Sequence, residues 1–317
     1  MKIVVTDADT VCSDGVTLDF LNKYGEATVY GLTAPDELAA RIADADVVLC
    51  NKTRIGAPEL ATATHLGMIG LFATGYNNID TAVCRSRGIA VCNVPGYSTE
   101  AVAQRTFALL LELTDRVAAY NETVERGDWV LSRTFSYFPY PTRELAGKTL
   151  GVVGYGAIGR RVAQIGKAFG MRVLAYWRHP APDGTVTPVD FDTLLRESDV
   201  VSLHCPLNAD SESCMDAAAF AAMKPGALFI NTARGGLVDE AALRQALDSG
   251  RLGGAGLDVL RQEPMAADCP LRGAPRCVMT PHTAWAGIET RLRLMGVVED
   301  NLRAFVAGTP INDVTAR

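Results

Sequence analysis

The sequence predicts an α/β protein with two wound parallel-sheet domains, one inserted into the other. Short apolar runs alternate with amphipathic stretches along most of the chain, as expected for parallel strands joined by helices. The alternation stops near residue 99 and begins again at residue 149. A last amphipathic segment, 285–306, follows the second series and is expected to pack on the first domain. The predicted domains are therefore 1–98 plus 285–317, and 99–284.

The first domain is predicted to contain five strands with helices between them. The predicted strands are brief, rich in Val, Ile and Leu, and bounded by turn residues; they are 3–6, 27–30, 46–50, 68–72 and 89–94. The stretches between them are predicted as helices at 16–24, 36–43, 58–62 and 80–87. This alternation indicates a parallel sheet.

A single long helix is predicted from Glu100 to about Tyr120. Ser98 or Thr99 can cap it, and its apolar side chains are spaced to form one buried face. An irregular connector rich in Tyr and Pro follows at 135–141. The second α/β series then runs from residue 149 to about residue 279.

Composition excludes several classes of protein. The formal net charge is −6 and no run of five Lys or Arg occurs, so nucleic acid is not an expected partner. No apolar stretch approaches the ~20 residues of a membrane-spanning helix, and Asp7 and Asp9 interrupt any signal-peptide core. The eight cysteines contain no CxxC pair, so we expect reduced thiols and no metal site. The expected location is cytoplasmic.

A glycine-rich turn follows the predicted strand that starts at residue 149. Gly154 permits a tight turn, Gly156 lets the backbone approach a pyrophosphate, and Gly159 allows close packing of helix and strand. The helix that follows offers free N–H groups and a positive dipole end to phosphates. Because strand, turn and helix occur in the required order, we predict a dinucleotide site that also includes Tyr155, Ala157 and Ile158.

The end of the next strand, 171–176, bears on the choice between NAD and NADP. A carboxylate at this position usually binds the ribose 2′-hydroxyl of NAD, whereas a basic residue suits the 2′-phosphate of NADP. Here the strand is followed by Trp177, Arg178 and His179. The sequence therefore predicts an NAD(P)(H) site that favours NADP(H), although Trp177 and Arg178 could instead only cover its edge.

Three side chains suited to acid–base and anion chemistry follow three separate predicted strands. Arg234 follows the strand 227–230, Glu263 follows 256–259, and His282 ends the series. Ligands of open α/β sheets bind at the carboxyl edge of the strands. We therefore expect these three side chains to meet at one rim.

With these motifs the sequence resembles the D-isomer specific 2-hydroxyacid dehydrogenase family over essentially the whole chain. The stretches that carry the resemblance are 73–80, 93–96, the glycine-rich turn, 231–235, 256–259, Glu263-Pro264 and Pro281-His282. Within the family, 51–53, 95–99 and 282–285 are most similar to the glycerate dehydrogenase/hydroxypyruvate reductase branch.

The resemblance implies a Rossmann-type NAD(P)-binding domain inserted into a flavodoxin-like substrate domain. It implies that a small 2-keto acid, such as hydroxypyruvate or glyoxylate, is reduced to the D-2-hydroxy acid by hydride from the nicotinamide. His282 would donate the proton, and Glu263 would favour its protonated form. Arg234 would bind the substrate carboxylate, together with N–H groups at Thr74 and Gly75 of the first domain.

Further residues are expected at the site with two interpretations each. Asp258 contacts the nicotinamide or makes a structural hydrogen bond, and Lys52 faces the substrate or lies on the surface. His204 and Pro206 line the cofactor crevice, or His204 is an ordinary core histidine. Thr232 and Ala233 are also expected to contact the cofactor.

The resemblance further implies a homodimer formed through the inserted domain. Subunit contact would explain the apolar cluster of Phe135, Tyr137, Phe138 and Tyr140 in the connector. The alternatives are another enzyme of the family, of D-lactate or phosphoglycerate type, and a non-catalytic dinucleotide-sensing protein that resembles the corepressors built on this fold. The physiological substrate and the direction of the reaction stay open.

Overall fold

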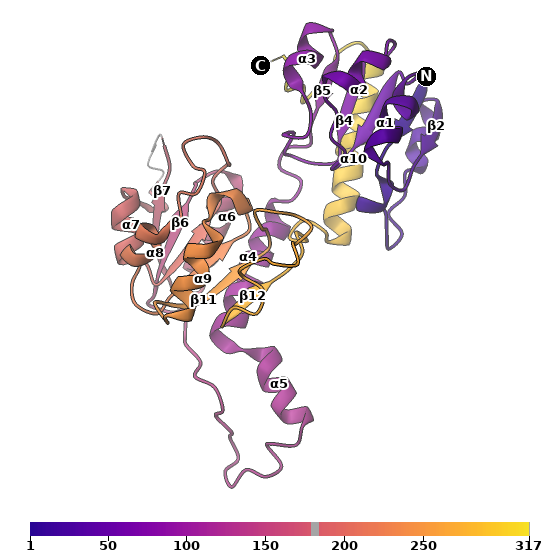
Figure 1. The fold of residues 1–317 in the computed structure, drawn as a ribbon. Helices are drawn as coiled ribbons and strands as arrows, with labels where there is room; N and C mark the ends of the chain where they lie inside the picture. Colours follow the sequence, from indigo (N-terminus) through magenta and orange to yellow (C-terminus); the bar gives the residue numbers. More distant parts are fainter. Residues whose placement is uncertain (179–183, 317) are drawn as a thin grey trace. The chain divides into compact units, whose positions relative to one another are not determined.

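The computed structural model describes residues 1–178 and 184–316, and the chain divides into two compact units. Met1–Ser98 and Trp285–Arg317 form the first unit, and Thr99–Ala284 form the second (Figure 1). Each unit has its own parallel sheet with hydrophobic clusters on both faces.

The first unit is built on a five-stranded sheet in the order β2-β1-β3-β4-β5, in which every strand pair is parallel. This is the flavodoxin-like order. Its strands are β1 (Lys2–Val5), β2 (Glu26–Val29), β3 (Val47–Cys50), β4 (Met68–Leu71) and β5 (Ala90–Cys92). The residues of β3, β4 and β5 are all buried, because helices cover both faces of the sheet.

One face packs with α1 (Pro35–Ile42), α2 (Ala57–Thr62) and α3 (Thr81–Ser86). The other face packs with the 3₁₀ segments η1 (Ala8–Thr10) and η2 (Asp19–Lys23) and with α10 (Ile288–Val306). Leu294 and Val298 of α10 share one apolar cluster with Ile3 and Val5 of β1. The last helix of the chain therefore completes the core begun by the first strand.

Two predicted helices of this unit need correction. The stretch 16–24 is not an α-helix, and only η2 forms within it. The two buried residues of the stretch, Val16 and Leu21, are five positions apart, and residues at that spacing do not share one face of an α-helix. The final helix starts at Ile288 and not at Trp285, because Gly287 is its N-cap. Trp285 instead lies edge-on to Tyr97, with ring centroids 6.5 Å apart.

The second unit is built on a seven-stranded, all-parallel sheet in the order β12-β11-β10-β9-β6-β7-β8. Counted from β6, this is the Rossmann order 3-2-1-4-5-6 with one more strand at the edge. Its strands are β6 (Thr149–Val153), β7 (Arg172–Tyr176), β8 (Thr187–Pro188), β9 (Val200–Leu203), β10 (Ala227–Asn231), β11 (Leu252–Leu257) and β12 (Cys277–Met279). The predicted fold class is confirmed.

Helices cover both faces of this sheet as well. On one face, α4 (Thr99–Asp115) packs against α6 (Ala157–Ala168), β10 and β11. The other face carries α7 (Phe191–Glu197), α8 (Ala217–Ala222) and α9 (Glu240–Asp248). A 3₁₀ turn, η3 (Gly235–Leu237), follows β10.

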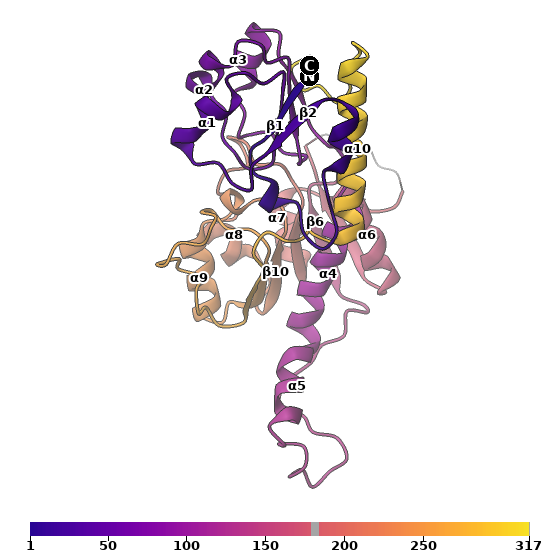
Figure 2. The same ribbon diagram turned by 90° about the vertical axis from the view of Figure 1, so that its right-hand side faces the viewer.

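The single long helix predicted from Glu100 is wrong, because α4 ends at Asp115 and α5 (Val117–Glu125) starts after a break at Arg116. Arg116 has a left-handed φ of 56°. The returning chain explains the break: the N–H of Arg143 donates to the Thr114 carbonyl, and the Arg116 guanidinium lies 4.0 Å from the centroid of the Tyr140 ring. As a result α5 and the loop after it extend away from the sheet of this unit (Figures 1 and 2).

Candidate active site

The predicted site residues of the second unit lie at the carboxyl edge of its sheet, each after one of its strands. Neighbouring strands β12, β11 and β10 lead to His282, to Asp258 and Glu263, and to Arg234. The next strands β9, β6 and β7 lead to 204–206, to the glycine-rich turn and to 177–178. The chain order reverses between β9 and β6, and such a reversal is where open α/β sheets bind ligands.

The glycine-rich turn has the close contacts that the sequence predicts. Gly154 has a φ of +96°, and a Cβ atom there would lie 2.5 Å from the backbone nitrogen of Cys205. A Cβ atom at Gly159 would lie 2.0 Å from the carbonyl oxygen of Gly154. Both positions therefore require glycine for the turn itself.

Gly156 is different, because a Cβ atom there would meet no atom within 4 Å. It is the N-cap residue of α6, and no side chain caps the first turn of this helix. Ala157 is exposed beside it, and Ile158 is partly buried against the core. An open approach to uncapped N–H groups fits a pyrophosphate, so the residues present are compatible with a dinucleotide.

Two aromatic side chains, Tyr155 and Trp177, pack against each other beside the turn. The rings of Tyr155 and Trp177 lie 4.9 Å apart, and the Arg160 guanidinium lies 4.6 Å from the Tyr155 ring centroid. Arg178 is exposed and forms an ion pair with Asp210, which belongs to the loop after β9. The neighbouring His179 lies outside the described residues.

His204 directly follows β9 and lies behind the glycine-rich turn. Its Nε2 is 2.8 Å from the Ser202 hydroxyl, while its Nδ1 is inaccessible to solvent and has no hydrogen-bond partner. Burial of the ring lowers the pKa of His204 from 6.5 to about 3, so the ring is neutral. Pro206 is exposed two residues further on. Their contact with a cofactor stays a prediction.

Arg234 is positioned by a turn that Asn231 holds together. The buried Asn231 side chain accepts from the Ala233 N–H at 2.9 Å and donates to the Arg234 carbonyl at 2.9 Å. Thr232 is buried, and its hydroxyl is 3.1 Å from that of Thr106 on α4. The Arg234 side chain is exposed, and its Nη1 donates to the Ala233 carbonyl at 2.7 Å. A planar guanidinium at this edge suits a carboxylate.

His282 and Glu263 form the pair that the sequence predicts. Nδ1 of His282 lies 2.6 Å from Oε2 of Glu263. The other carboxylate oxygen accepts from the N–H of Leu260 at 2.9 Å. The carboxylate is thus fixed by the loop after β11, and it holds one ring nitrogen of His282 so that the other is available.

Asp258 is almost fully buried, and both of its carboxylate oxygens accept hydrogen bonds from the loop that carries His282. Oδ1 accepts from the Thr280 hydroxyl and from the Thr283 N–H at 3.0 Å, and Oδ2 accepts from the Ala284 N–H at 2.8 Å. His282 lies between these donors with a left-handed φ of 54°. These contacts favour the structural interpretation of Asp258; a contact with the nicotinamide stays a prediction.

The first unit carries its predicted site residues at the carboxyl edge of its own sheet. Lys52 follows β3 with an exposed side chain, and Thr74 and Gly75 follow β4. The Thr74 hydroxyl donates to the Val94 carbonyl at 2.6 Å. The N–H groups at 74 and 75 remain candidates for holding a carboxylate.

Sequence reasoning missed Asp7, which holds the loop of the candidate residue Lys52. Its buried carboxylate accepts from the backbone N–H groups of Asn51, Lys52 and Thr53 at 2.8, 2.6 and 2.9 Å. It therefore fixes the loop that carries Lys52. Asp210 was missed as well, because it contacts Arg178 from 32 residues away. No local sequence signal marks either contact.

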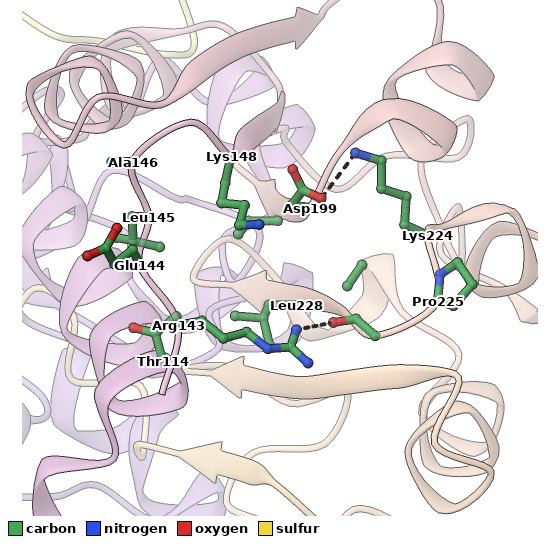
Figure 3. Close-up of a pocket in the computed structure, with 13 residues that line it drawn as sticks. Thr114, Arg143, Glu144, Leu145, Ala146, Lys148, Asp199, Lys224, Pro225 and Leu228 are labelled. Carbon is green, nitrogen blue, oxygen red and sulfur yellow. Dashed lines mark hydrogen bonds and ion pairs between the residues drawn. The ribbon is translucent and has the colours of Figure 1, made fainter. Parts of the chain in front are cut away.

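The opposite edge of the second sheet has a cavity of about 510 Å³, separate from these residues (Figure 3). Its charged groups are largely engaged: Lys224 pairs with Asp199 at 3.0 Å, and Arg143 donates to the Gly226 carbonyl at 3.0 Å. Within 1–178 and 184–316, no group of three or more His, Cys, Asp or Glu side chains is placed to hold a metal ion. In the same part of the chain, no helix has the length and apolar character to cross a membrane.

Comparison with known proteins agrees with this geometry. Residues 107–284 match the NAD binding domain of D-isomer specific 2-hydroxyacid dehydrogenases. The chain is 41% identical to a hydroxypyruvate reductase of Blautia hydrogenotrophica and 40% identical to a glycerate dehydrogenase of Methylorubrum extorquens, with 99% of each chain covered in both cases. Among solved structures, an acyclic imino acid reductase in complex with NADPH and D-Arg superposes with a TM-score of 0.89 at 33% identity, covering 99% of this chain and all of that one.

The chain therefore belongs to the D-isomer specific 2-hydroxyacid dehydrogenase family, as predicted. It is an oxidoreductase with an NAD(P)-binding domain.

Proposed function

We propose that this enzyme reduces a small 2-keto acid, hydroxypyruvate or glyoxylate, to the 2-hydroxy acid with hydride from NADPH. The observation that carries the proposal is the His282–Glu263 pair, 2.6 Å apart, on the same sheet edge as Arg234. Relatives named hydroxypyruvate reductase and glycerate dehydrogenase, which align over nearly the whole chain, support the substrate class.

The reaction divides among the chain's own residues. Arg234 binds the substrate carboxylate through two parallel hydrogen bonds and orients the keto group. His282 donates a proton to the keto oxygen, and in the reverse direction it removes that proton from the hydroxyl. Glu263 binds Nδ1 of His282 and fixes the orientation of the ring. Acid–base transfer by a positioned side chain contributes ~10²–10⁴-fold to the rate.

The cofactor is proposed to lie across the glycine-rich turn and to supply the hydride. Gly154, Gly156 and Gly159 would bring the first turn of α6 to its pyrophosphate. Trp177 and Arg178 would bind the adenosine end. Arg178 carries the preference for NADP(H), because its guanidinium can bind a 2′-phosphate and no carboxylate directly follows β7.

We place the enzyme in the cytoplasm as a homodimer. All eight cysteines are free thiols, as is usual in reducing compartments. The loop after α5 exposes large apolar side chains, among them Val130, Leu131, Phe135 and Phe138, each more than 80% exposed. Tyr140, by contrast, packs edge-on against Tyr120 within the chain. Such an apolar surface favours contact with a second subunit, which light scattering after gel filtration would detect as twice the chain mass.

The test is initial-rate kinetics with hydroxypyruvate, glyoxylate and pyruvate, each with NADPH and with NADH. We expect the highest kcat/KM for hydroxypyruvate or glyoxylate with NADPH. Arg234→Lys should raise KM and lower kcat, since an ammonium cannot reproduce the planar fork, whereas Arg272→Lys on the surface should not. Cofactor binding without reduction of any of the three acids would favour the non-catalytic alternative.

A further inference from the structure

The cofactor corner of the second unit contains a carboxylate that lies far from it in sequence. Asp210 forms an ion pair with Arg178, the residue that follows Trp177 after β7. Both side chains are mostly exposed, and Asp210 belongs to the loop that leaves β9. The sheet order places β9 and β7 on either side of β6, whose end forms the glycine-rich turn.

The loop that carries Asp210 is held by its own hydrogen bonds. The Asn208 side chain accepts from the N–H groups of Asp210 and Ser211 at 3.0 and 3.1 Å. The Ser211 hydroxyl donates to the Pro206 carbonyl at 2.8 Å and accepts from the Asn208 N–H at 2.9 Å. These bonds hold the backbone of the loop that carries Asp210.

We infer that Asp210 limits the preference for NADPH over NADH by neutralising Arg178. The inference rests on the proposed role of Arg178 at the 2′-phosphate. A phosphate must share or displace the Asp210 carboxylate, and it must also approach a second negative charge. A ribose 2′-hydroxyl is uncharged, so its binding neither displaces the Asp210 carboxylate nor brings two negative charges together. Asp210 therefore weakens the binding of NADPH and leaves that of NADH nearly unchanged.

The residue thus limits a preference that Arg178 alone would make stronger. The ion pair is solvent-exposed, so its loss changes affinity modestly. We expect Asp210→Asn, which keeps the size of the side chain, to lower the Kd for NADPH about two- to fivefold. The effect should shrink as salt concentration rises, because both charges are exposed to solvent.

The experiment measures the Kd values for NADPH and for NADH by isothermal titration calorimetry of the full-length protein, without substrate. It compares the wild type with Asp210→Asn, Arg178→Ala and the double variant. Asp268→Asn, an exposed aspartate elsewhere in the same unit, is the matched control. We expect Asp210→Asn to tighten the binding of NADPH but not of NADH, and to have a smaller effect once Arg178 is alanine, because only the repulsion between phosphate and carboxylate is then relieved. Thermal melting verifies that each variant is folded.

The outcomes separate the two proposals. If Arg178→Ala weakens NADPH binding but Asp210→Asn leaves it unchanged or weaker, the inference about Asp210 is wrong and the cofactor site stands. Weaker NADH binding in Asp210→Asn, with NADPH unchanged, would make Asp210 an acceptor for the ribose hydroxyl and would also overturn the inference. Unchanged NADPH affinity in Arg178→Ala would refute both the role of Arg178 at the 2′-phosphate and the inference about Asp210.

Discussion

Replacing Asp258 by asparagine tests how the loop that carries His282 is held. The carboxylate is 1% exposed and accepts three hydrogen bonds, from the Thr280 hydroxyl and from the N–H groups of Thr283 and Ala284. A hydrogen bond to a charged acceptor contributes about 1.5–3 kcal/mol, against about 0.5–1.5 kcal/mol for a neutral one. In asparagine the amide oxygen can still accept from Thr280 and Thr283, and each bond is weakened by about 1 kcal/mol; the NH2 group that replaces Oδ2 cannot accept from the Ala284 N–H, so that bond, about 1.5–3 kcal/mol, is lost. The lower cost of burying a neutral amide offsets part of this loss.

We therefore expect Asp258→Asn to lower the free energy of opening of this loop by about 2–3 kcal/mol. Hydrogen exchange followed by mass spectrometry measures this locally. Protection of the amides of Thr283 and Ala284 should fall roughly thirty- to a hundredfold, since each 1.4 kcal/mol is a factor of ten. Thr280→Val removes one of the three donors to the charged carboxylate and should cost about 1.5–3 kcal/mol.

Asp268→Asn, at an exposed position in the same unit, controls for the loss of charge alone. If amide protection in Asp258→Asn stays within about threefold of the wild-type value, this reasoning is refuted, because a loss of roughly thirty- to a hundredfold is expected. The loop would then be held by its backbone contacts, such as the His282 N–H to Asp258 carbonyl bond of 2.7 Å.

Three further predictions follow from the site. His282→Ala should lower kcat for keto-acid reduction by about 10²–10⁴-fold with cofactor affinity nearly unchanged, and wild-type turnover would exclude its role as the acid. Gly156→Ala should weaken NADPH binding in calorimetry at unchanged melting temperature, because its Cβ meets no protein atom, whereas Gly159→Ala should lower the melting temperature. His204, with a pKa of about 3 in the fold against 6.5 as its ordinary value, is protonated first in the unfolded chain. Its contribution to stability is complete above pH 6.5 and is lost at about 1.4 kcal/mol per pH unit as the pH falls towards 3. Urea titrations between pH 7 and 5 should therefore show a shallower pH dependence for His204→Gln, and equal slopes would contradict the buried neutral ring.

The sequence pattern was enough to predict those elements that depend on consecutive residues alone. Buried parallel strands read as continuous apolar runs, so β3, β4 and β6 were predicted to within a residue or two. The glycine-rich turn was predicted in detail because its requirements are steric and local: positions 154 and 159 have no room for a Cβ atom. Arg234, Glu263 and His282, the residues proposed for catalysis, were predicted to lie at one sheet edge because each follows a strand of one parallel sheet, and the structure has them there.

Contacts between distant segments decided the rest. The break at Arg116 depends on the chain returning at Arg143, and helix propensity around residue 116 carries no sign of it. Asp7 and Asp210 are acidic residues like many others in the sequence, and for Asp258 the sequence leaves two interpretations open. Their roles are set by the backbone groups and the guanidinium that folding places beside them. The sequence by itself determined the fold class, the glycine-rich turn and the placing of Glu263 and His282 at one sheet edge, because these depend on short-range sterics and strand order. Only the tertiary structure decided which carboxylates hold the loops, because those hydrogen bonds join residues up to 46 positions apart.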